Sequence, residues 1–297
     1  MSSSFFERLA AFIFMKKHLL TIALIMLSFM GSAQELSLMT YNIRYATVND
    51  GENQWEKRKD DVSSQLLFYA PDIFGIQEGL KVQVNYLDES LQSYAFVGVG
   101  RDDGKSKGEF CAIFYNKDKF QLLGEHTFWL SETPEKVSKG WDAAYERICT
   151  FAFFMDKTTG NNFWVFNTHF DHIGELAREK SAELIVEKIK EVNKDGFPVF
   201  ILGDFNLNEK SEAIKYLSSH YNDARKISLE KPFGPNGTFT GFEFHEPVKD
   251  RIDYIFCSKG VIQVKKYGVL ADSKEERYPS DHFPVMIQAE VNMPVKN

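Results

Sequence analysis

The chain has little cysteine and no excess of positive charge. Its 297 residues carry a formal charge of −7 and an isoelectric point near 5.6. A nonspecific nucleic-acid coat needs a basic surface, so this class is disfavoured. Cys111, Cys149 and Cys257 lie inside apolar runs and form no CxxC or Cys/His spacing, which excludes the usual structural zinc motifs. Buried free thiols are the simpler interpretation, although an oxidising compartment would allow one disulfide.

The sequence also lacks linkers, low-complexity stretches and exact repeats. Hydrophobic residues make up 43% of the chain and charged residues 26%, with 27 Phe. These fractions are typical of globular proteins and exclude a disordered, collagen-like or coiled-coil chain. We therefore expect a single domain over residues 34–297.

The one long apolar run lies near the start of the chain. Lys16 and Lys17 precede an apolar segment over residues 19–30, and the small residues of Gly31–Ala33 follow it. This layout predicts a secretory signal peptide over residues 1–33, with Met15 as an alternative start. The run is too short to span a bilayer comfortably, but an uncleaved amino-terminal anchor is the alternative. The expected product is exported, periplasmic or extracellular, and carries a formal charge of −9, because cleavage removes three basic residues and one acidic residue.

Strand-like and helix-like segments alternate along the rest of the chain. Apolar, β-branched or aromatic runs bounded by turn residues predict strands at 36–43, 72–77, 94–99, 111–115, 148–155, 163–168, 199–203, 252–257 and 284–291. Helical patterns cover 55–69, 81–92, 175–193 and 209–219. Two of the strands, DIFGIQE and VFILGDFN, end in acidic residues and precede helices, which indicates two related halves that face each other. The fold class expected is α/β or α+β, as a sandwich.

Polar residues recur where these apolar runs begin or end. A carboxylate at the edge of a buried strand is unfavourable unless it is paired or binds a metal. A single such residue usually caps a turn or helix, but here the pattern is repeated. The residues are Asn42, Glu78, His169, Asp204, Asn206, Asp253, Asp281 and His282.

The residue types in this set point to metal-assisted hydrolysis. Oxygen donors suit a hard cation such as Mg²⁺ or Mn²⁺, with Ca²⁺ as an alternative. A histidine beside a carboxylate is a common acid–base pair. Asp281 and His282 are adjacent and would point to opposite sides of a strand, so Asp253 or Asp204 is expected to orient His282. Asp204 and Asn206 would share one face of an extended strand.

The ordered motifs YNIR, GIQE, NTHFDH, GDFN, RIDYIF and SDHFPV run from Tyr41 to Val285. In this order they resemble the endonuclease/exonuclease/phosphatase superfamily, which includes deoxyribonuclease I and exonuclease III. The resemblance implies a four-layer α-β-β-α sandwich of two mixed sheets with helices outside. It also implies a divalent-metal-dependent phosphoester hydrolase.

The same resemblance implies roles for individual residues. Glu78 would be the main metal carboxylate, with Asn42 beside it and Asp281 completing or bracing the metal site. Asp204, helped by Asn206, would align and deprotonate the attacking water. His282, oriented by Asp253, would bind the phosphate and take part in proton transfer. His169 would donate a hydrogen bond to a phosphate oxygen. Arg44 and Arg147 would bind the substrate.

The substrate is less well defined by the sequence. The favoured function is that of a nuclease-like phosphodiesterase. The alternative is a phosphomonoesterase or phospholipase C-like enzyme that acts on sugar, inositol or lipid phosphates. A third hypothesis is a noncatalytic binding module. The loops RDDGKSKGEF and NGTFTGFEFHEP could contact substrate. Arg147 could instead form a surface ion pair with Glu146. Trp55 could pack on the sheet rather than on substrate. The histidines outside the strand-end set, including His172, are expected at the surface. A monomer is expected.

Overall fold

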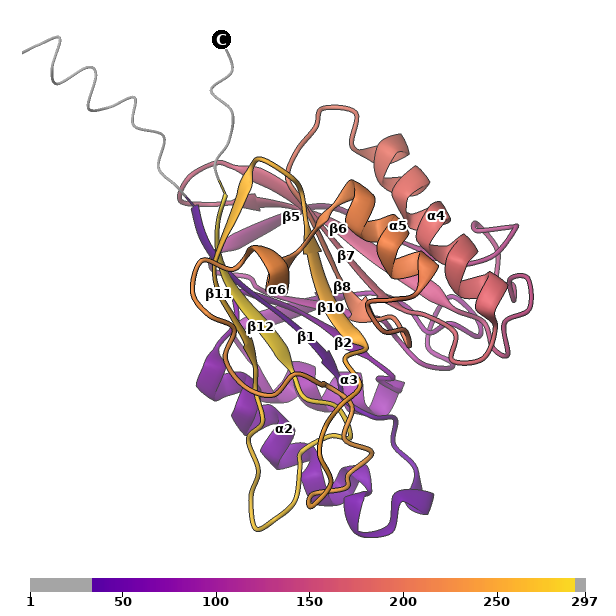
Figure 1. Ribbon diagram of the computed structural model, residues 1–297, viewed down its shortest axis with the longest axis vertical. Helices are drawn as coiled ribbons and strands as arrows, with labels where there is room; N and C mark the ends of the chain where they lie inside the picture. Colours follow the sequence, from indigo (N-terminus) through magenta and orange to yellow (C-terminus); the bar gives the residue numbers. More distant parts are fainter. Residues whose placement is uncertain (1–33, 292–297) are drawn as a thin grey trace, which may run out of the picture.

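The computed structural model describes residues 34–291, and the predicted signal peptide lies outside the described residues. Two six-stranded mixed sheets pack face to face, with α2 and α3 on one outer side and α4 and α5 on the other (Figure 1). The four-layer sandwich is thus confirmed. None of the helices within the described range combines the length and apolar character that a membrane crossing requires.

The order of strands in the first sheet is β11-β12-β1-β2-β4-β3. Its strands are β1 (Gln34–Asn42), β2 (Ile73–Gln77), β3 (Tyr94–Val97), β4 (Ile113–Asn116), β11 (Ile262–Val269) and β12 (Val285–Val291). The helical elements beside it are η1 (Val48–Asn53), α2 (Trp55–Tyr69) and α3 (Lys81–Ser90).

The order in the second sheet is β5-β6-β7-β8-β10-β9. Its strands are β5 (Phe120–Trp129), β6 (Ile148–Asp156), β7 (Asn162–His169), β8 (Val199–Asp204), β9 (Asn222–Asp223) and β10 (Asp253–Cys257). The helices that follow β7, β8 and β9 are α4 (Glu175–Val192), α5 (Glu212–His220) and α6 (Ala224–Ile227).

A strand–helix–strand unit lies at the centre of each sheet. In the first sheet β1 and β2 are parallel and α2 connects them, and in the second sheet β7 and β8 are parallel and α4 connects them. Parallel strands with a helical crossover end at the same sheet edge. The two predicted halves therefore exist, and the carboxyl ends of all four strands carry residues of the predicted site.

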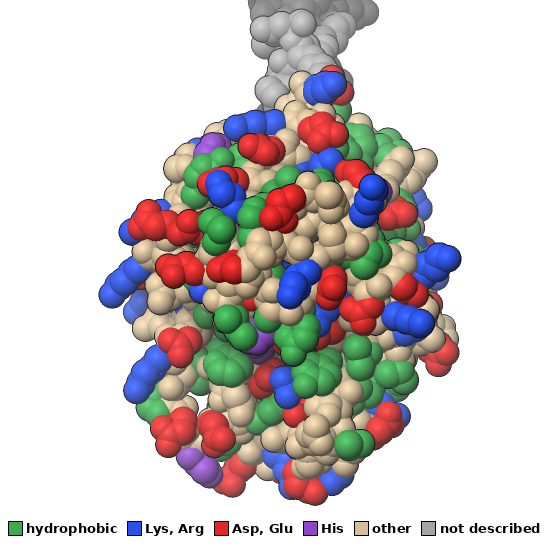
Figure 2. Space-filling view, turned by 90° about the vertical axis from the view of Figure 1, so that its right-hand side faces the viewer, with side chains coloured by type: hydrophobic (Ala, Val, Ile, Leu, Met, Phe, Trp, Pro, Cys, Tyr) green, Lys and Arg blue, Asp and Glu red, His purple; other side chains and the backbone are tan. Residues whose placement is uncertain are grey.

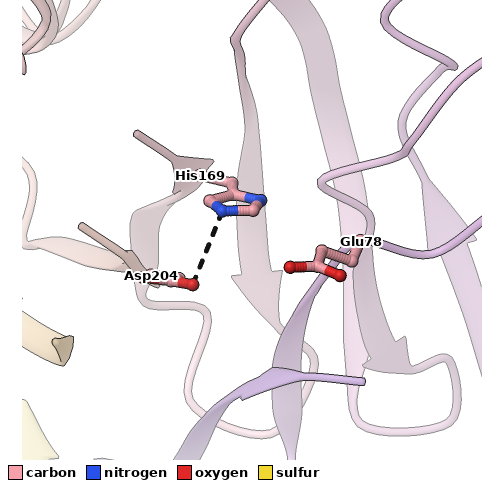
Figure 3. A group of neighbouring side chains, drawn as sticks. All are labelled: Glu78, His169 and Asp204. Atoms are coloured by element: carbon pink, nitrogen blue, oxygen red, sulfur yellow. Dashed lines mark ion pairs between the residues drawn. The ribbon is translucent and has the colours of Figure 1, made fainter. Parts of the chain in front are cut away.

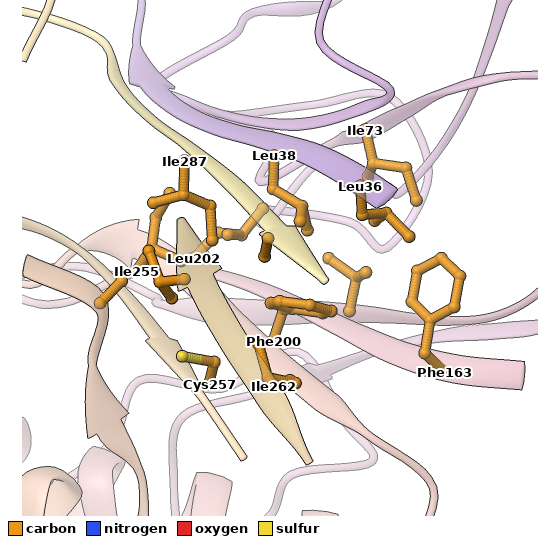
Figure 4. Close-up of a cluster of buried hydrophobic side chains, with 14 of the residues drawn as sticks. Leu36, Leu38, Ile73, Phe163, Phe200, Leu202, Ile255, Cys257, Ile262 and Ile287 are labelled. Atoms are coloured by element: carbon orange, nitrogen blue, oxygen red, sulfur yellow. The ribbon is translucent and has the colours of Figure 1, made fainter. Parts of the chain in front are cut away.

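Aliphatic and aromatic side chains fill the space between the sheets. Leu36, Leu38 and Ile73 of the first sheet meet Phe163 and Phe200 of the second, and all of them are at most 2% exposed (Figure 4). Two further clusters bury the faces of α2 and α3 and of α4 and α5 against their own sheets. Every layer of the sandwich thus has an apolar contact with the next layer.

The expected strands and helices match the observed ones to within a few residues, but the strands β5, β9 and β11 and the short helical elements η1 and α6 were not expected. β5 and β11 are edge strands, and each contains a register shift, near Gly124 and near Lys265. A bulge interrupts the alternation of apolar and polar residues that identifies a strand. The expectation that Asp281 and His282 lie on opposite sides of a strand is wrong, because both precede β12.

Candidate active site

The site lies where the carboxyl ends of the central strands of both sheets meet. Asn42 ends β1, Glu78 follows β2, and His169 and Asp204 end β7 and β8. His169 pairs with Asp204, and Asp204 pairs with Asp253 of the antiparallel β10. The pairing register therefore places these three polar residues in one row across the second sheet.

Asn42 connects the two sheets. Its Nδ2 donates to Glu78 Oε1 at 3.0 Å and to Asp204 Oδ2 at 2.9 Å, and its Oδ1 accepts from the Arg44 backbone N–H at 3.0 Å. The side chain is completely buried. In this orientation the amide nitrogen faces the two carboxylates, so Asn42 fixes their separation.

Glu78 faces Asp204 and His169 across the gap between the sheets (Figure 3). One ligand atom from each of these three residues lies within 4.8 Å of the others, which is close enough to share one metal ion. The Glu78 backbone is left-handed, with φ of 61°, and Oε2 accepts from the Tyr45 backbone N–H at 3.1 Å. A strained backbone at a polar residue that faces a cavity is a common feature of functional sites.

Asp204 lies at the centre of the hydrogen-bond network. Its Oδ1 accepts from the Asn206 backbone N–H at 2.9 Å, and Asn206 has a φ of 50°. The expected extended backbone at Asn206 is therefore wrong, although Asn206 does bind to Asp204 through its backbone N–H. Burial and the nearby Asp253 carboxylate raise the pKa of Asp204 to about 7, against the opposing effect of His282. A carboxyl with a pKa near neutrality is suited to exchange protons.

Asp253 orients His282, as predicted. The Asp253 carboxylate Oδ2 lies 2.9 Å from His282 Nδ1, and His282 Nε2 lies 3.7 Å from Asp204 Oδ2. Burial alone would lower the pKa of His282, but Asp253 and Asp204 together raise it well above its usual value. These two carboxylates thus favour the cationic form of the imidazole, whose Nε2 faces Asp204.

His169 is held in the neutral form. Asn206 Nδ2 donates to His169 Nε2 and to the Phe170 carbonyl oxygen, both at 3.0 Å, which places the imidazole proton on Nδ1. Burial, followed by the charges of Arg147 and Arg101, lowers the pKa of His169 well below its usual value. Nδ1 has no hydrogen-bond partner among the residues that the structure describes, so this donor is available to a phosphate oxygen.

Arg147 is a buried cation of the site, and the alternative of a surface ion pair with Glu146 is wrong. Its side chain is 5% exposed; Nε donates to Asp171 Oδ2 at 3.2 Å and Nη2 lies 3.0 Å from His172 Nδ1. Nη1 has no partner within residues 35–291. Arg147 therefore keeps one donor for an anion, while Asp171 and His172 hold the guanidinium in place.

Arg44 lies beside three carboxylates, those of Asp50, Glu78 and Asp281. It donates to both carboxylate oxygens of Asp50, at 3.0 and 2.9 Å, and lies about 4 Å from Glu78 and from Asp281. Burial, and after it repulsion from Glu78, raises the pKa of Asp281, against the opposing charges of His282 and of the two nearby arginines. These close carboxylates are hard oxygen donors that a divalent cation would stabilise, so the donor set fits Mg²⁺ or a similar ion.

The site opens into a cavity of about 700 Å³. All of the predicted site residues either line it or, for Asn42 and Asp253, bind directly to residues that line it. The wall also contains Arg101, Glu109 and Phe239, which lie in the two loops expected to contact substrate, and Tyr145 and His172, to which no role was assigned from the sequence.

Glu109 carried a signal that could have been used. It directly precedes the apolar run FCAIFY, and β4 is antiparallel to β2, so the start of this run lies at the same sheet edge as the end of β2. His172, expected at the surface, contacts Arg147 and lines the cavity.

Two other expectations concern residues outside the chemistry. Trp55 is 2% exposed and packs in the core beneath α2, so it is not a stacking platform for substrate. Cys111, Cys149 and Cys257 are all buried and free, which confirms the interpretation as unpaired thiols.

Comparisons with known proteins agree on one family. The sequence model of the Endonuclease/Exonuclease/phosphatase family matches residues 39–282. A solved structure titled mannosyl-6-phosphatase, from Bacteroides thetaiotaomicron, superposes with a TM-score of 0.82 at 40% identity, covering 86% of this chain and 99% of that one.

Two curated sequences illustrate the wider range of relatives. Protein L388 of Acanthamoeba polyphaga mimivirus, described as uncharacterized, is 30% identical over 79% of this chain and 91% of its own length. The Saccharomyces cerevisiae CCR4-Not complex 3'-5'-exoribonuclease subunit Ccr4 is 21% identical over 80% of this chain, which spans only 35% of that protein.

Proposed function

The chain belongs to the endonuclease/exonuclease/phosphatase family of divalent-metal-dependent phosphoester hydrolases, and we propose that it removes the phosphate group from a phosphorylated sugar. The observation that carries this proposal is the cavity of about 700 Å³ around the phosphate-handling residues. That volume is within the range of about 300–1,000 Å³ that small-molecule sites have. The 40% identity to a mannosyl-6-phosphatase supports the same substrate class.

The charge distribution agrees with a small substrate. On the face shown in Figure 2, acidic and basic side chains are intermixed, without a broad basic area for a nucleic-acid backbone. The cavity wall itself contains acidic as well as basic side chains, including Glu109 beside Arg101. A substrate with a single phosphate and neutral hydroxyl groups fits this wall better than a polyanion does.

The residues of the chain divide the work of hydrolysis. Arg147 Nη1 and His169 Nδ1, which have no hydrogen-bond partner in the described part of the chain, would donate to the phosphoryl oxygens. Asp204, whose pKa is near 7, would take a proton from the attacking water, and Asn42 and Asn206 fix its position. His282, kept cationic by Asp253, would stabilise the developing charge and supply a proton to the leaving oxygen.

A divalent cation would complete the site. We propose Mg²⁺, with Mn²⁺ or Ca²⁺ as alternatives, held by Glu78 and Asp281 at the side where Asn42 lies. When bound, this ion supplies charge neutralisation at the phosphoryl group. Asn42 would need to turn its amide to offer oxygen, and its assignment as a metal ligand remains a prediction.

A substrate panel tests the proposal. Phosphate release would be measured from hexose 6-phosphates, inositol phosphates, phospholipid headgroups and short RNA and DNA, with Mg²⁺ and with chelator. We expect hexose phosphates to give the highest kcat/KM, and activity to require the cation. Asp204→Asn should lower kcat by about 10²- to 10⁴-fold, while Asp195→Asn, on an exposed loop, should not change it. Preference for an oligonucleotide would reject the sugar phosphatase assignment.

A phosphodiesterase, nuclease-like, is the second candidate. A neighbouring hollow of about 380 Å³ is lined by Lys210, Arg225, Lys249 and Arg251 and shares Asp250 with the active-site cavity. An oligonucleotide could place its next phosphate there. If the panel favours oligonucleotides, charge-removing variants of Lys210 and Lys249 should reduce cleavage and its salt dependence.

Export of the protein is part of the proposal and rests on the sequence of residues 1–33. Amino-terminal sequencing of the protein from the culture medium and from the periplasm should find Gln34 as the first residue. A product that starts at Met1 or Met15 would instead support an uncleaved anchor. Sedimentation of the processed protein should give the mass of a monomer.

A further inference from the structure

We propose that Arg101 and Glu109 form a subsite that binds hydroxyl groups of the sugar and selects which sugar phosphate is hydrolysed. This inference rests on the proposed function and adds to it the residues that read the substrate. Neither residue belongs to the groups assigned above to the metal, the water or the phosphate.

Glu109 is held next to the catalytic centre by backbone pairing. The Phe110 N–H donates to the Gly79 carbonyl oxygen at 2.8 Å, so Glu109 lies beside the chain segment that carries Glu78. Its Oε2 lies 3.8 Å from His169 Nδ1, the atom that carries the donor for phosphate. A phosphate bound to that donor would therefore bring the attached sugar close to Glu109.

The loop that carries both residues is ordered by its own hydrogen bonds. Asp103 Oδ1 accepts the backbone N–H groups of Lys105, Ser106 and Lys107 at 2.8 to 2.9 Å. The Trp129 indole N–H donates to the Arg101 carbonyl oxygen at 2.8 Å. A loop that is fixed before substrate binds loses little entropy on binding, as a specificity site requires.

Arg101 and Glu109 form an ion pair that suits hydroxyl groups. Arg101 Nη1 donates to Glu109 Oε2 at 2.7 Å, and the two side chains are 11% and 17% exposed. The carboxylate accepts hydrogen bonds and the guanidinium donates them, so together they match the donor and acceptor of a sugar hydroxyl. Tyr145, which is 52% exposed, lies 5.4 Å from the guanidinium and supports it from the cavity wall.

The same pair disfavours a second phosphate at this position. Glu109 already neutralises the charge of Arg101, and a further anion would be repelled by the carboxylate. This part of the wall is therefore charged but without excess positive charge. The geometry favours a polyol over a bisphosphate or a nucleic-acid backbone.

Deoxy substrates test this subsite directly. kcat/KM would be measured for the best hexose 6-phosphate, for its monodeoxy analogues, and for phenyl phosphate, which has no hydroxyl group. For the wild type, kcat/KM should be at least about tenfold lower with one or more deoxy analogues than with the parent sugar phosphate, because a site built to bind a hydroxyl group rejects an analogue without it. In Glu109→Gln and Arg101→Lys, kcat/KM should fall by at least about tenfold for the parent sugar phosphate but by less than about threefold for phenyl phosphate. For the deoxy analogue that the wild type already hydrolyses poorly, the two variants should lower kcat/KM little further.

Lys105→Gln, an exposed change on the same loop, is the matched control and should leave all substrates unaffected. Equal losses of Glu109→Gln on the sugar phosphate and on phenyl phosphate would overturn the subsite, because they would place Glu109 in catalysis or metal binding. No loss on any substrate would overturn it as well. A wild type that hydrolyses phenyl phosphate but no hexose phosphate would reject the proposed function itself, and this inference with it.

Discussion

His282 and Asp253 form the most directly testable pair at the scale of single residues. Burial disfavours the imidazolium, and Asp253, which lies 2.9 Å away, is the first of the groups that restore it. Asp253→Asn removes that charge, so the pKa of His282 should fall toward or below its usual value. If the protonated His282 is required, activity should be lost at lower pH than in the wild type.

The measurement is the pH profile of kcat for the wild type and for Asp253→Asn, with saturating metal. We expect the alkaline limb of the variant to move down by at least about one pH unit, with a lower maximum. An alkaline limb at the same pH in both proteins would show that His282 is not the acid that the profile reports.

Asp204 should destabilise the metal-free fold at neutral and alkaline pH. Its folded-state pKa of about 7 lies above the usual 3.8, so between these values the folded protein holds a proton that the unfolded chain has lost. Its contribution to stability therefore decreases as the pH rises from about 4 to about 7. In chelator, Asp204→Asn should raise the melting temperature by a few degrees at pH 8, and the difference should vanish near pH 4.

Thermal unfolding at both pH values, in chelator, checks this prediction, and Asp195→Asn serves as the exposed control. A variant that melts below the wild type at pH 8 would contradict it. Such a result would mean that the hydrogen bonds of Asp204 to Asn42 and Asn206 outweigh the burial of its charge.

Most residues of the site could be predicted from the sequence because polar residues recur at the ends of several apolar runs, which a single turn or helix cap does not explain. Glu109 directly precedes an apolar run and shows the same pattern, but the charged residues before it in the loop resemble it and obscure that pattern. The partners of Arg147 could not be predicted, because Asp171 and His172 approach it only when β6 and β7 pair. Contacts between neighbouring strands depend on the register of their pairing, which cannot be predicted from this sequence alone.

At the scale of elements, Gly75 of β2 shows how closely the two sheets approach. A Cβ at this position would lie 2.5 Å from Asn167 Cγ of β7. Asn167 Nδ2 donates to the carbonyl oxygens of Ile76 and Ala112, both at 2.9 Å, and its Oδ1 accepts from Gln77. This buried amide thus connects β7 to the strand that leads to Glu78.

Gly75→Ala should therefore lower the free energy of unfolding by roughly 1–3 kcal/mol, as overpacked cores do. Gly124→Ala in β5 is the matched control, because no heavy atom lies within 4 Å of its Cβ position, and it should be nearly neutral. Denaturant unfolding of both variants gives the comparison. Equal stability of the two would mean that Asn167 moves aside at little cost.

The edges of the sheets explain which elements could not be predicted. Central strands such as β2 and β8 are buried on both faces and appear as continuous apolar runs. β5 and β11 have one neighbour each, and the extra residues at their bulges, Leu123 and Lys265, break the alternation of apolar and polar side chains. The left-handed conformations of Glu78 and Asn206 were equally hidden, since neither residue is a glycine.

At the scale of the whole molecule, a divalent cation should stabilise the fold. The site gathers Glu78, Asp204 and Asp281 between the two sheets, and a cation bound there stabilises only the folded state. At a concentration about 100-fold above Kd, the gain is about 2.7 kcal/mol. We expect Mg²⁺ to raise the melting temperature of the chelated protein by about 5 °C or more.

Differential scanning calorimetry with and without Mg²⁺ measures this shift without reference to catalysis. Glu78→Gln should abolish most of it, whereas Glu187→Gln, on the exposed face of α4, should keep it. An unchanged melting temperature of the wild type with Mg²⁺, Mn²⁺ and Ca²⁺ would contradict the metal assignment.

The central claim is that this family member is a sugar phosphate monoesterase, and one matched pair of substrates tests it most directly. kcat/KM would be measured for a hexose 6-phosphate and for its methyl phosphodiester, which differ by a single methyl group on the phosphate. The account predicts that the monoester is preferred by at least about a hundredfold, because Arg147 Nη1 and His169 Nδ1 are proposed to bind oxygens of a terminal phosphoryl group, one of which carries a methyl group in the diester. A preference for the diester would contradict it and would establish the phosphodiesterase instead.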